Sequence, residues 1–397
     1  MTPRVSDAVP GRIPAPPETG LGRGWEPATL VTAVLLLLAF GLVNLYSASS
    51  FLAQRQDLPD YFYVVRQTAG AALALVVLVL CARIPYNWWA HLAWPLLFVT
   101  WAFLLVLVLP WTHGVAPEVN GARRWLHLGG GVVFQPSELA KLAVVVWTAA
   151  LAVKKQGQFR SLSRGLLPFL LVWAAVIVPI LLQPDLSTAF IVAGLGAVVV
   201  FAGGGRLGHF VFLGALSVPL LARELGFGFR VDRILAFRDL EAHASGAGYQ
   251  VHQSLVALGS GGVTGVGFGE GRQKFGFLPE PHNDFIFSMI GEEWGLLGVI
   301  LLVVLYLTII LVGFRIAAGA RHRFGQLLAV GLASFIAMQA WLHMMVGLGL
   351  VPPTGVSLPF VSYGRSNLLV TAASVGILVS VAQAPSRNAA GLEATGR

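Results

Sequence analysis

Long apolar runs recur along almost the whole chain, and they constrain its fold more than any other feature. Each run holds about 18–25 residues, enough for a helix to cross the hydrocarbon core of a bilayer. Because a spanning segment must satisfy its own backbone hydrogen bonds, such runs predict an all-α polytopic membrane protein. About ten runs can be delimited, at residues 29–48, 65–83, 87–110, 136–153, 165–182, 186–204, 207–222, 285–313, 326–350 and 366–385.

The composition supports a membrane protein. Hydrophobic residues make up 56% of the chain and charged residues 11%, whereas soluble domains carry roughly 25% charged residues. The net charge of +8 does not indicate nucleic-acid binding, because the basic residues gather in the tail and in alternate loops. They are Arg4, Arg12, Arg23, Lys154, Lys155, Arg160, Arg164, Arg206, Arg315, Arg321 and Arg323. The positive-inside rule then predicts that both termini are cytoplasmic and that one large loop, about 223–283, is extracytoplasmic.

Both ends of the chain are expected to lie outside the membrane domain. Residues 1–26 are rich in Pro and Arg and predict a disordered cytoplasmic tail, and residues 386–397 predict a second one. The first apolar run exceeds the core of a signal peptide, so we interpret it as an uncleaved anchor, although Ser47-Ala48-Ser49 resembles a cleavage site. Residues 27–385 then form the membrane domain. Cys81 is the only cysteine, so no disulfide framework is possible.

Four polar segments are predicted to face outside, and the first is 121–141, GARRWLHLGGGVVFQPSELAK. Arg123 and Arg124 lie at a predicted interface. Guanidinium groups there either bind phosphate or carboxylate oxygens or anchor lipid head groups. Glu138 and Lys141 are three residues apart and therefore neighbours on one helix face. Such a pair either lines a cavity or orients helices, and it is costly to bury unless the two charges satisfy each other.

The next two segments differ in length. The turn 183–188 contains Asp185, which we expect to cap the following helix. The loop 223–283 is charged in its first half and glycine-rich in its second, but it lacks the strand, helix and lysine context of a nucleotide-binding loop. A loop of about 60 residues is usually functional or disordered, and the hydrophobic content of this one favours order.

The stretch 278–298, LPEPHNDFIFSMIGEEWGLLG, is the most informative. A polar loop ends at Asn283-Asp284, and an apolar helix follows at once. A carboxylate in this place is a candidate for function, because ionisable groups at membrane depth are costly; the alternative is that Asn283 or Asp284 caps the helix. Glu292 lies roughly 12 Å further along, so Glu292 and Glu293 are expected to make helix contacts or line a cavity.

The fourth segment, 352–367, reads PPTGVSLPFVSYGRSN and carries Ser362, Tyr363 and Arg365. Its prolines are compatible with a re-entrant or broken helix, which a membrane tolerates only where protein or a cavity surrounds the backbone. The histidines of the chain lack the spacing of metal ligands. The sequence therefore indicates no metal site and no evident cofactor, and it leaves a requirement for a divalent cation open.

These segments together resemble the SEDS family, the shape, elongation, division and sporulation proteins. The matching blocks are GARRW with QPSELAK, QPDLSTA, GYQVHQSLVALGSGGVTGVGFGEGRQKFGFLPEPHNDFIFSMIGEEWG and LPFVSYG, and the resemblance runs from about residue 27 to 385. It implies ten membrane helices and a bacterial peptidoglycan glycosyltransferase that polymerises lipid II outside the cytoplasmic membrane. It also implies a class B penicillin-binding protein as the partner that cross-links the product.

The resemblance extends to particular residues. The acidic catalytic candidate of the family matches Asp284, and the arginines of its GARRW block match Arg123 and Arg124. The division and sporulation branch is closer than the elongation branch, which implies a place at the septum with other divisome proteins; an elongation-type polymerase is the alternative. One departure is SYGRSN where SYGGSS is usual, so that Arg365 and Asn367 replace small residues.

The implied reaction assigns a chemical role to each candidate residue. Attack of a sugar hydroxyl needs a base, which a carboxylate can supply, and a diphosphate leaving group needs cations. We therefore predict Asp284 as the base. The predicted substrate contacts are Arg123, Arg124, Lys274, Ser362 and Arg365. A lipid II flippase and a noncatalytic divisome scaffold are the alternatives; charges used for transport gather at the bilayer midplane, whereas the polar clusters here gather on one face.

Overall fold

The computed structural model describes residues 24–118, 121–129, 133–159, 161–211, 214–215 and 248–384, and most of them are helical. The first half of the chain forms α1 (Trp25–Arg55), α2 (Phe62–Arg83), α3 (Trp88–Val108), α4 (Pro136–Lys155), α5 (Leu167–Leu182) and α6 (Leu186–Ala202). The second half forms α9 (Tyr249–Gly261), α10 (Ile286–Gly319), α11 (Arg323–Gly347) and α12 (Arg365–Gln383). The short elements are the hairpin of β1 (Leu126–His127) and β2 (Val133–Phe134), and the single turns Gln156–Gln158, Leu162–Leu166 and Gln273–Phe275.

Within the described residues, eight helices are long and apolar enough to cross a membrane, and α6 is a shorter apolar helix. They correspond to nine of the predicted runs and confirm an all-α polytopic fold. Most of the run predicted at 207–222, the first part of the loop 223–283 up to residue 247, and the tail 386–397 lie outside the described residues. The rest of that loop is described and contains α9 and the turn Gln273–Phe275. The helix α1 begins at Trp25, close to the predicted start of the membrane domain, and residues 1–23 of the predicted tail lie outside the described residues.

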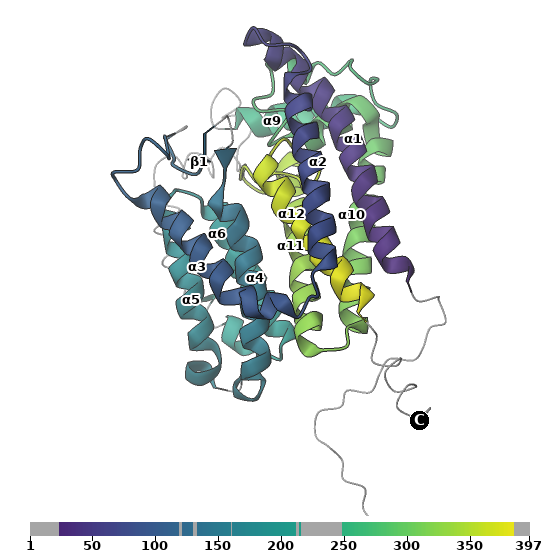
Figure 1. Ribbon diagram of the computed structural model, residues 1–397. Helices are drawn as coiled ribbons and strands as arrows, with labels where there is room; N and C mark the ends of the chain where they lie inside the picture. Colours follow the sequence, from purple (N-terminus) through teal and green to yellow (C-terminus); the bar gives the residue numbers. More distant parts are fainter. Residues whose placement is uncertain are drawn as a thin grey trace, which may run out of the picture.

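Figure 1 shows two groups of helices that meet at the centre of the molecule. The helices α3, α5 and α6 lie on one side, and α1, α2 and α10 lie on the other. The helices α4 and α12 form the protein interior. In their apolar spanning stretches 78% and 83% of the residues are buried, compared with 28% in α3 and 44% in α1. Residues on α4 and α12 therefore reach the interior, whereas α1 and α3 expose much of their surface to lipid.

The helices α2 and α12 run parallel and pack very closely. Arg365 at the start of α12 contacts Gly70 in the outer half of α2, and the Ser380 hydroxyl near the end of α12 donates to the Ile84 carbonyl just past α2. A methyl group at Gly376 would lie 2.3 Å from the Leu78 carbonyl oxygen. Small residues at such contacts let helix backbones approach each other in membrane proteins.

The helix α10 is broken at Gly295, whose φ of 65° and ψ of −160° are not helical. The glycine-rich segment 261–267 fills the break. The N–H groups of Val266 and Gly267 donate to the carbonyls of Glu292 and Glu293, and those of Leu296 and Leu297 donate to Gly262 and Val263. These bonds replace the missing helical ones, which is how irregular backbone is tolerated at membrane depth.

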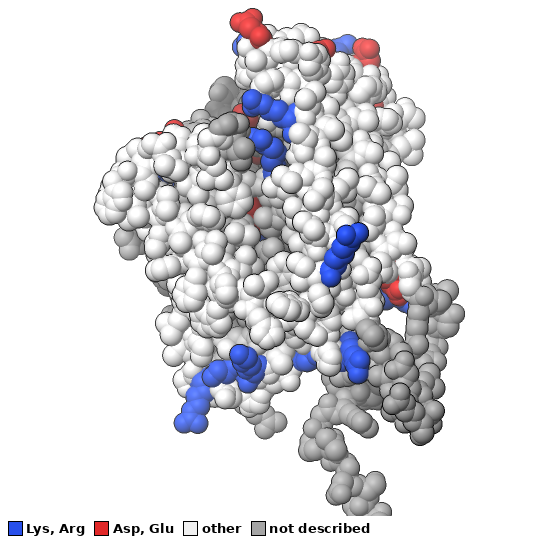
Figure 2. Space-filling model, in the orientation of Figure 1, with Lys and Arg blue, Asp and Glu red and all other residues white. Residues whose placement is uncertain are grey.

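The surface charges lie mainly at the two ends of the helix bundle. Figure 2 shows Lys and Arg side chains along the lower end, where Figure 1 shows α10 joined to α11. Charges of both signs lie at the upper end, which carries α9 and β1, and the surface between is mostly uncharged. This distribution agrees with the positive-inside orientation, in which the upper end is extracytoplasmic.

Candidate active site

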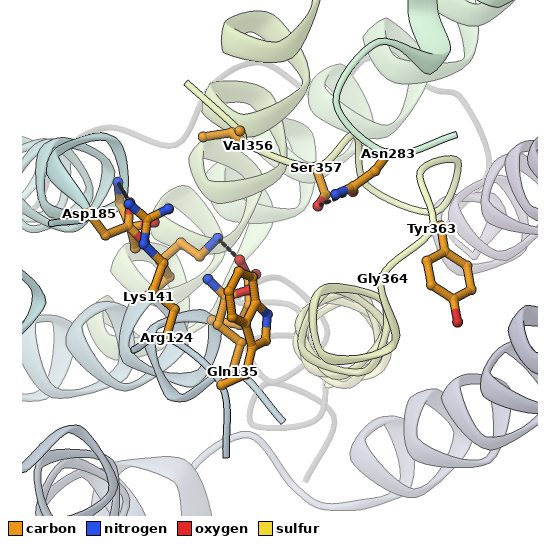
Figure 3. Close-up of a pocket in the computed structure, with 13 residues that line it drawn as sticks. Arg124, Gln135, Lys141, Asp185, Asn283, Val356, Ser357, Tyr363 and Gly364 are labelled. Carbon is orange, nitrogen blue, oxygen red and sulfur yellow. Dashed lines mark hydrogen bonds and ion pairs between the residues drawn. The ribbon is translucent and has the colours of Figure 1, made fainter. Parts of the chain in front are cut away.

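A polar cavity of about 100 Å³ lies at the end of the molecule that carries β1 (Figure 3). All four predicted polar segments contribute to its lining: the chain from Arg124 to the start of α4, the turn between α5 and α6, the residue before Asp284, and the loop before α12. The polar side chains among the lining residues include Arg124, Gln135, Glu138, Lys141, Asp185 and Asn283. Segments far apart in the sequence therefore meet at one site.

The pair Glu138–Lys141 forms one wall of this cavity. Lys141 Nζ lies 2.7 Å from Glu138 Oε1, and the two side chains are 1% and 8% exposed. Asn367 Nδ2 donates to Glu138 Oε2 at 2.8 Å and to Gln339 Oε1 at 2.5 Å. The buried charges thus compensate each other, and the network joins α4, α11 and α12. Asn367, one of the unusual residues in SYGRSN, acts here as a helix-to-helix contact.

Arg124 supplies the cavity with a positive charge and is held by backbone carbonyls. Its Nε donates to the Gln183 carbonyl at 3.1 Å and its Nη2 to the Pro184 carbonyl at 2.5 Å. The nearby Asp185 instead accepts from the Thr188 N–H at 3.1 Å, which confirms that it caps α6. In the described part of the chain, no carboxylate oxygen lies within 4.0 Å of the Arg124 guanidinium. Such a cation is suited to binding a phosphate.

Asp284 lies half-buried beside the cavity, between Asn283, which lines it, and α10. Its backbone N–H donates to the Glu280 carbonyl, and its Oδ2 lies 3.6 Å from the position of a methyl group at Gly355, another lining residue. The N-cap residue of α10 is Phe285 and makes no side-chain cap bond. Neither Asn283 nor Asp284 occupies the N-cap position, so the capping alternative is wrong for α10.

The loop before α12 holds the Asp284 segment in place. The Ser362 hydroxyl donates to the Asn283 carbonyl at 2.7 Å and accepts from the Leu358 N–H at 2.9 Å. The Ser357 hydroxyl donates to Asn283 Oδ1 at 3.3 Å. Ser362, a predicted substrate contact, is buried and engaged in these bonds, so its geometry is that of a positioning residue.

Two other predicted substrate contacts also lie outside the cavity lining. Arg123 donates from Nε, Nη1 and Nη2 to the Ala116 carbonyl, the Leu109 carbonyl and the Thr112 hydroxyl, at 2.9, 3.0 and 2.7 Å. Its guanidinium therefore cross-links the loop between α3 and β1. Arg365 packs against Gly70 of α2 and is not part of the cavity lining.

Lys274 is a buried ion-pair partner in this structure. Its Nζ lies 2.9 Å from Glu293 Oε1 and donates to the Ser47 hydroxyl at 2.8 Å and to the Gly269 carbonyl at 2.5 Å. Glu292 accepts from the backbone N–H groups of Arg272 and Gln273. Lys274 and Glu292 thus hold the glycine-rich loop against α1 and α10, in agreement with the structural contacts expected of Glu292.

An aromatic cluster lies on the far side of the Asp284 segment. The His282 ring lies between Tyr63 and Tyr363, with ring centres 5.2 and 5.7 Å away. Burial lowers the pKa of His282 from 6.5 to about 4, so its imidazole is neutral at pH 7. Burial also raises the pKa of Glu280, whose Oε2 lies 3.7 Å from His282 Nε2.

Sequence reasoning missed several residues that the structure places at the site. Gln135, Asn283, Ser357 and Tyr363 line the cavity. Gln67 of α2 is buried and holds the loop before α12 through the Ser362 carbonyl and the Gly364 N–H. The position of Asn283 directly before Asp284 was a usable signal, whereas nothing in the sequence connects Gln67 with residues almost 300 positions away.

No candidate metal centre is present among the described residues, where no three His, Cys, Asp or Glu side chains are grouped in a way that could hold an ion. The polar cavity combines a half-buried carboxylate at its edge, the Arg124 guanidinium and several amide and hydroxyl groups. Chemically, this arrangement can accept a proton from a hydroxyl group and stabilise a phosphate anion.

Comparisons with known proteins agree in family and fold. The family model for FtsW, RodA and SpoVE, described as cell cycle protein, matches residues 28–387. The chain is 38% identical to a probable peptidoglycan glycosyltransferase FtsW of Trichlorobacter lovleyi over 89% of this chain and 92% of the relative. It is also 38% identical to the stage V sporulation protein E of Bacillus subtilis, over 89% of this chain and 96% of that protein.

Solved structures give the same result. A chain from a peptidoglycan synthase complex that coordinates polymerization and crosslinking superposes with a TM-score of 0.75, at 30% identity, covering 91% of this chain and 98% of that one. The rod shape determining protein RodA of Thermus thermophilus gives a TM-score of 0.64 at 30% identity, covering 92% and 98%. By sequence and by fold, the chain belongs to the FtsW/RodA/SpoVE family of membrane-embedded cell cycle proteins.

Proposed function

We propose that this chain is a peptidoglycan glycosyltransferase of the division type, which joins lipid II units into glycan strands outside the cytoplasmic membrane. The 38% identity to a probable peptidoglycan glycosyltransferase FtsW over most of both chains supports this assignment. The match to a sporulation protein at the same identity supports the division and sporulation branch over the elongation branch. We place the protein at the division septum on the same grounds.

The observation that carries the proposal is the placement of Asp284 beside a cavity that Arg124 lines. The acceptor sugar hydroxyl must lose a proton as it attacks the anomeric carbon, and a half-buried carboxylate within hydrogen-bond reach can accept it. The bond that breaks joins the anomeric carbon to the lipid diphosphate, and negative charge develops on that leaving group. Arg124 is held by two carbonyls, so it can stabilise this charge without rearranging.

The surrounding residues prepare these two groups. Glu138 and Lys141 give the cavity a polar wall with no net charge, and Arg124 and Asp185 each add one charge, of opposite sign, to the lining. Asn283 and Gln135 offer amide groups suited to sugar hydroxyls. Ser362 fixes the Asp284 segment, Arg123 fixes the loop that carries Arg124, and Lys274 fixes the glycine-rich loop. These three predicted substrate contacts are better described as positioning residues.

The proposed partner is a class B penicillin-binding protein that cross-links the strands. The likeness to a chain of a peptidoglycan synthase complex that coordinates polymerization and crosslinking supports such a partner. Lipid II, the growing strand and divisome proteins complete the proposed set. None of the described features calls for nucleic acid.

The proposal is tested by polymerisation of lipid II with the purified protein and a purified class B partner, with strands resolved on a gel. Asp284→Asn removes the base and keeps the shape, so strand formation should fall by about 100-fold or more. Asp57→Asn is the matched control, because Asp57 is exposed between α1 and α2 and its φ of 55° suits Asn. If the Asp284→Asn variant formed glycan strands as fast as the Asp57→Asn variant, this result would falsify the assignment of Asp284 as the base.

A further inference from the structure

The segment between α11 and α12 depends on side chains for its hydrogen bonds. Between Val351 and Ser357, no backbone N–H or carbonyl group bonds to the backbone of another described residue. Gly355, Val356 and Ser357 of this segment nevertheless line the cavity. Holding irregular backbone in one conformation costs entropy, which other contacts have to offset. The side chains that bind this segment therefore help to set the shape of the cavity.

His343 supplies one of these contacts from α11. Its Nδ1 lies 2.7 Å from the Val356 carbonyl oxygen, and the residue is 1% exposed. A carbonyl oxygen can only accept a hydrogen bond, so Nδ1 carries the proton. The other ring nitrogen, Nε2, is buried and has no hydrogen-bond partner among the described residues. Within the described part of the chain, the imidazole thus directs its one hydrogen bond at Val356.

The neighbours of Val356 contact the segment that carries Asp284. The Ser357 hydroxyl donates to Asn283 Oδ1 at 3.3 Å, and Figure 3 shows these two side chains directed toward each other. On the other side of Val356, a methyl group at Gly355 would lie 3.6 Å from Asp284 Oδ2. A shift of the Val356 carbonyl would therefore move groups that lie next to the carboxylate.

The same face of α11 also supports the wall that contains Glu138. Gln339 lies four residues before His343, which makes the two residues neighbours on the helix surface. Its Oε1 accepts from Asn367 Nδ2 at 2.5 Å, and Asn367 also donates to Glu138 at 2.8 Å. No described residue of α11 belongs to the cavity lining, although both contacts start there. This helix therefore acts on the cavity through its neighbours.

We propose that His343 is a positioning residue for glycosyl transfer, which fixes the segment 355–357 so that Asp284 faces the acceptor hydroxyl. This inference rests on the proposed function and adds to it a residue outside the cavity lining. Proton transfer requires the base within hydrogen-bond reach of the hydroxyl, and a misplacement of about 1 Å can cost about 100-fold in rate. Because His343 acts on a backbone carbonyl beside the base, its loss should lower kcat more than it raises KM.

Lipid II polymerisation by the purified full chain with a class B partner tests this role through two substitutions. His343→Asn keeps an N–H donor attached to Cγ, as Nδ1 is, whereas His343→Leu leaves the Val356 carbonyl without its donor. We expect kcat per folded molecule within about threefold of the wild type for His343→Asn and about tenfold lower for His343→Leu. The KM for lipid II should stay within about threefold in both variants.

The order of the two substitutions distinguishes hydrogen bonding from packing. Leu is closer to His in volume than Asn is, and it suits an apolar interior, so a role in filling space alone predicts that His343→Leu is the more active variant. His91→Leu is the matched control, because His91 is exposed on α3, and it should leave kcat unchanged. Equal rates for His343→Asn and His343→Leu, or a wild-type rate for His343→Leu, would overturn the inference.

A double variant tests whether the effect passes through Asp284. In the Asp284→Asn background the base is already absent, so His343→Leu should cause no further loss of kcat. A further tenfold loss in that background would show that His343 acts on another part of the protein, and it would contradict the proposed role.

The contact itself can be measured without turnover. In a Cys81→Ala background, the thiol of Ser357→Cys should react with a bulky reagent about threefold faster when His343→Leu is added, because the segment is less constrained. Adding His343→Asn should leave the rate unchanged. If this pattern appeared but the wild type formed no strands, the proposed function would fail while the contact would be confirmed. If strands formed and neither kcat nor thiol reactivity distinguished the two substitutions, only the inference about His343 would fail.

Discussion

Arg123 and Arg124 are adjacent in the chain and have different surroundings. The Arg123 guanidinium donates hydrogen bonds to three groups of one loop. The Arg124 guanidinium donates to two backbone carbonyls and also lines the cavity. One arginine of the pair thus stabilises the loop while the other faces the cavity. The two side chains thus form a natural pair of test and control.

Arg124→Gln should reduce the kcat of lipid II polymerisation by about 100-fold, because a charge that stabilises the departing diphosphate is lost. Arg123→Gln should lower thermal stability, because three hydrogen bonds to the loop are lost. Its kcat per folded molecule should stay within about threefold of the wild-type value. Steady-state kinetics on purified protein, corrected for the folded fraction, measures both. Equal losses of kcat in the two variants would contradict the separation of roles.

The depressed pKa of His282 predicts a pH effect on stability. The folded protein takes up the proton at a pH of about 4, whereas the unfolded chain does so near 6.5. Between these values the unfolded state binds more protons, so the free energy of unfolding falls as the pH drops through this window, by about 2 kcal/mol at pH 5. Above pH 6.5 this group adds no pH dependence.

His282→Phe keeps a ring between Tyr63 and Tyr363 and removes the titration. The melting temperature in detergent should therefore fall less between pH 7 and pH 5 for His282→Phe than for the wild type. Glu280 remains in both proteins, so its own titration cancels to first order in the comparison. Parallel melting curves for the two proteins across this range would show that His282 does not control the effect.

Single residues also show where sequence reasoning reached its limit. Asp284 could be singled out because a carboxylate at the start of an apolar helix needs an explanation. The ion pair of Glu138 and Lys141 follows from their spacing alone. Lys274 could not be assigned correctly, because its partners Ser47 and Glu293 come from other parts of the chain and only the folded structure shows them.

At the scale of single elements, the break in α10 has the clearest physical cause. The glycine-rich segment crosses the helix at contact distance: a methyl group at Gly295 would lie 2.3 Å from the Gly265 nitrogen, and one at Gly265 would lie 2.1 Å from the Glu293 carbonyl oxygen. The sequence of α10 is a continuous apolar run after Gly295, and hydropathy alone predicts one unbroken helix. The break depends on a partner segment that local patterns do not reveal.

Gly295→Ala should destabilise the protein by about 3 kcal/mol or more, because it combines a strained φ and ψ with a backbone clash. Gly259→Ala is the control, since Gly259 lies in α9 with open space around it, and Ala there should be neutral or stabilising by up to about 1 kcal/mol. Thermal unfolding in detergent compares them. Similar melting temperatures for the two variants would mean that the stability of the protein does not depend on the close packing of the glycine-rich segment against Gly295.

At the scale of the whole molecule, polar segments from across the sequence converge at one end of a bundle built around α4 and α12. The helical class and the approximate span positions were predictable, because apolar length and charge asymmetry are local properties. The assembly of the cavity was not, because it depends on which helices are neighbours. Arg365 illustrates this: it lies two residues from Tyr363, which lines the cavity, yet packs against α2.

Chemical modification of a residue in the cavity tests the central claim most directly. Cys81 is the only cysteine and is buried, so a Cys81→Ala background allows one thiol to be placed by Ser357→Cys in the cavity lining. A Ser163→Cys variant is the control, because Ser163 is exposed in the turn between α4 and α5. Both are assayed with the class B partner before and after treatment with a bulky thiol reagent.

We predict that a membrane-impermeant reagent added from outside modifies Ser357→Cys and stops lipid II polymerisation, and that lipid II slows the modification. The Ser163→Cys variant should react only with a permeant reagent and should keep its activity. Complete modification of Ser357→Cys with polymerisation at the untreated rate would contradict the claim that glycosyl transfer takes place in this cavity.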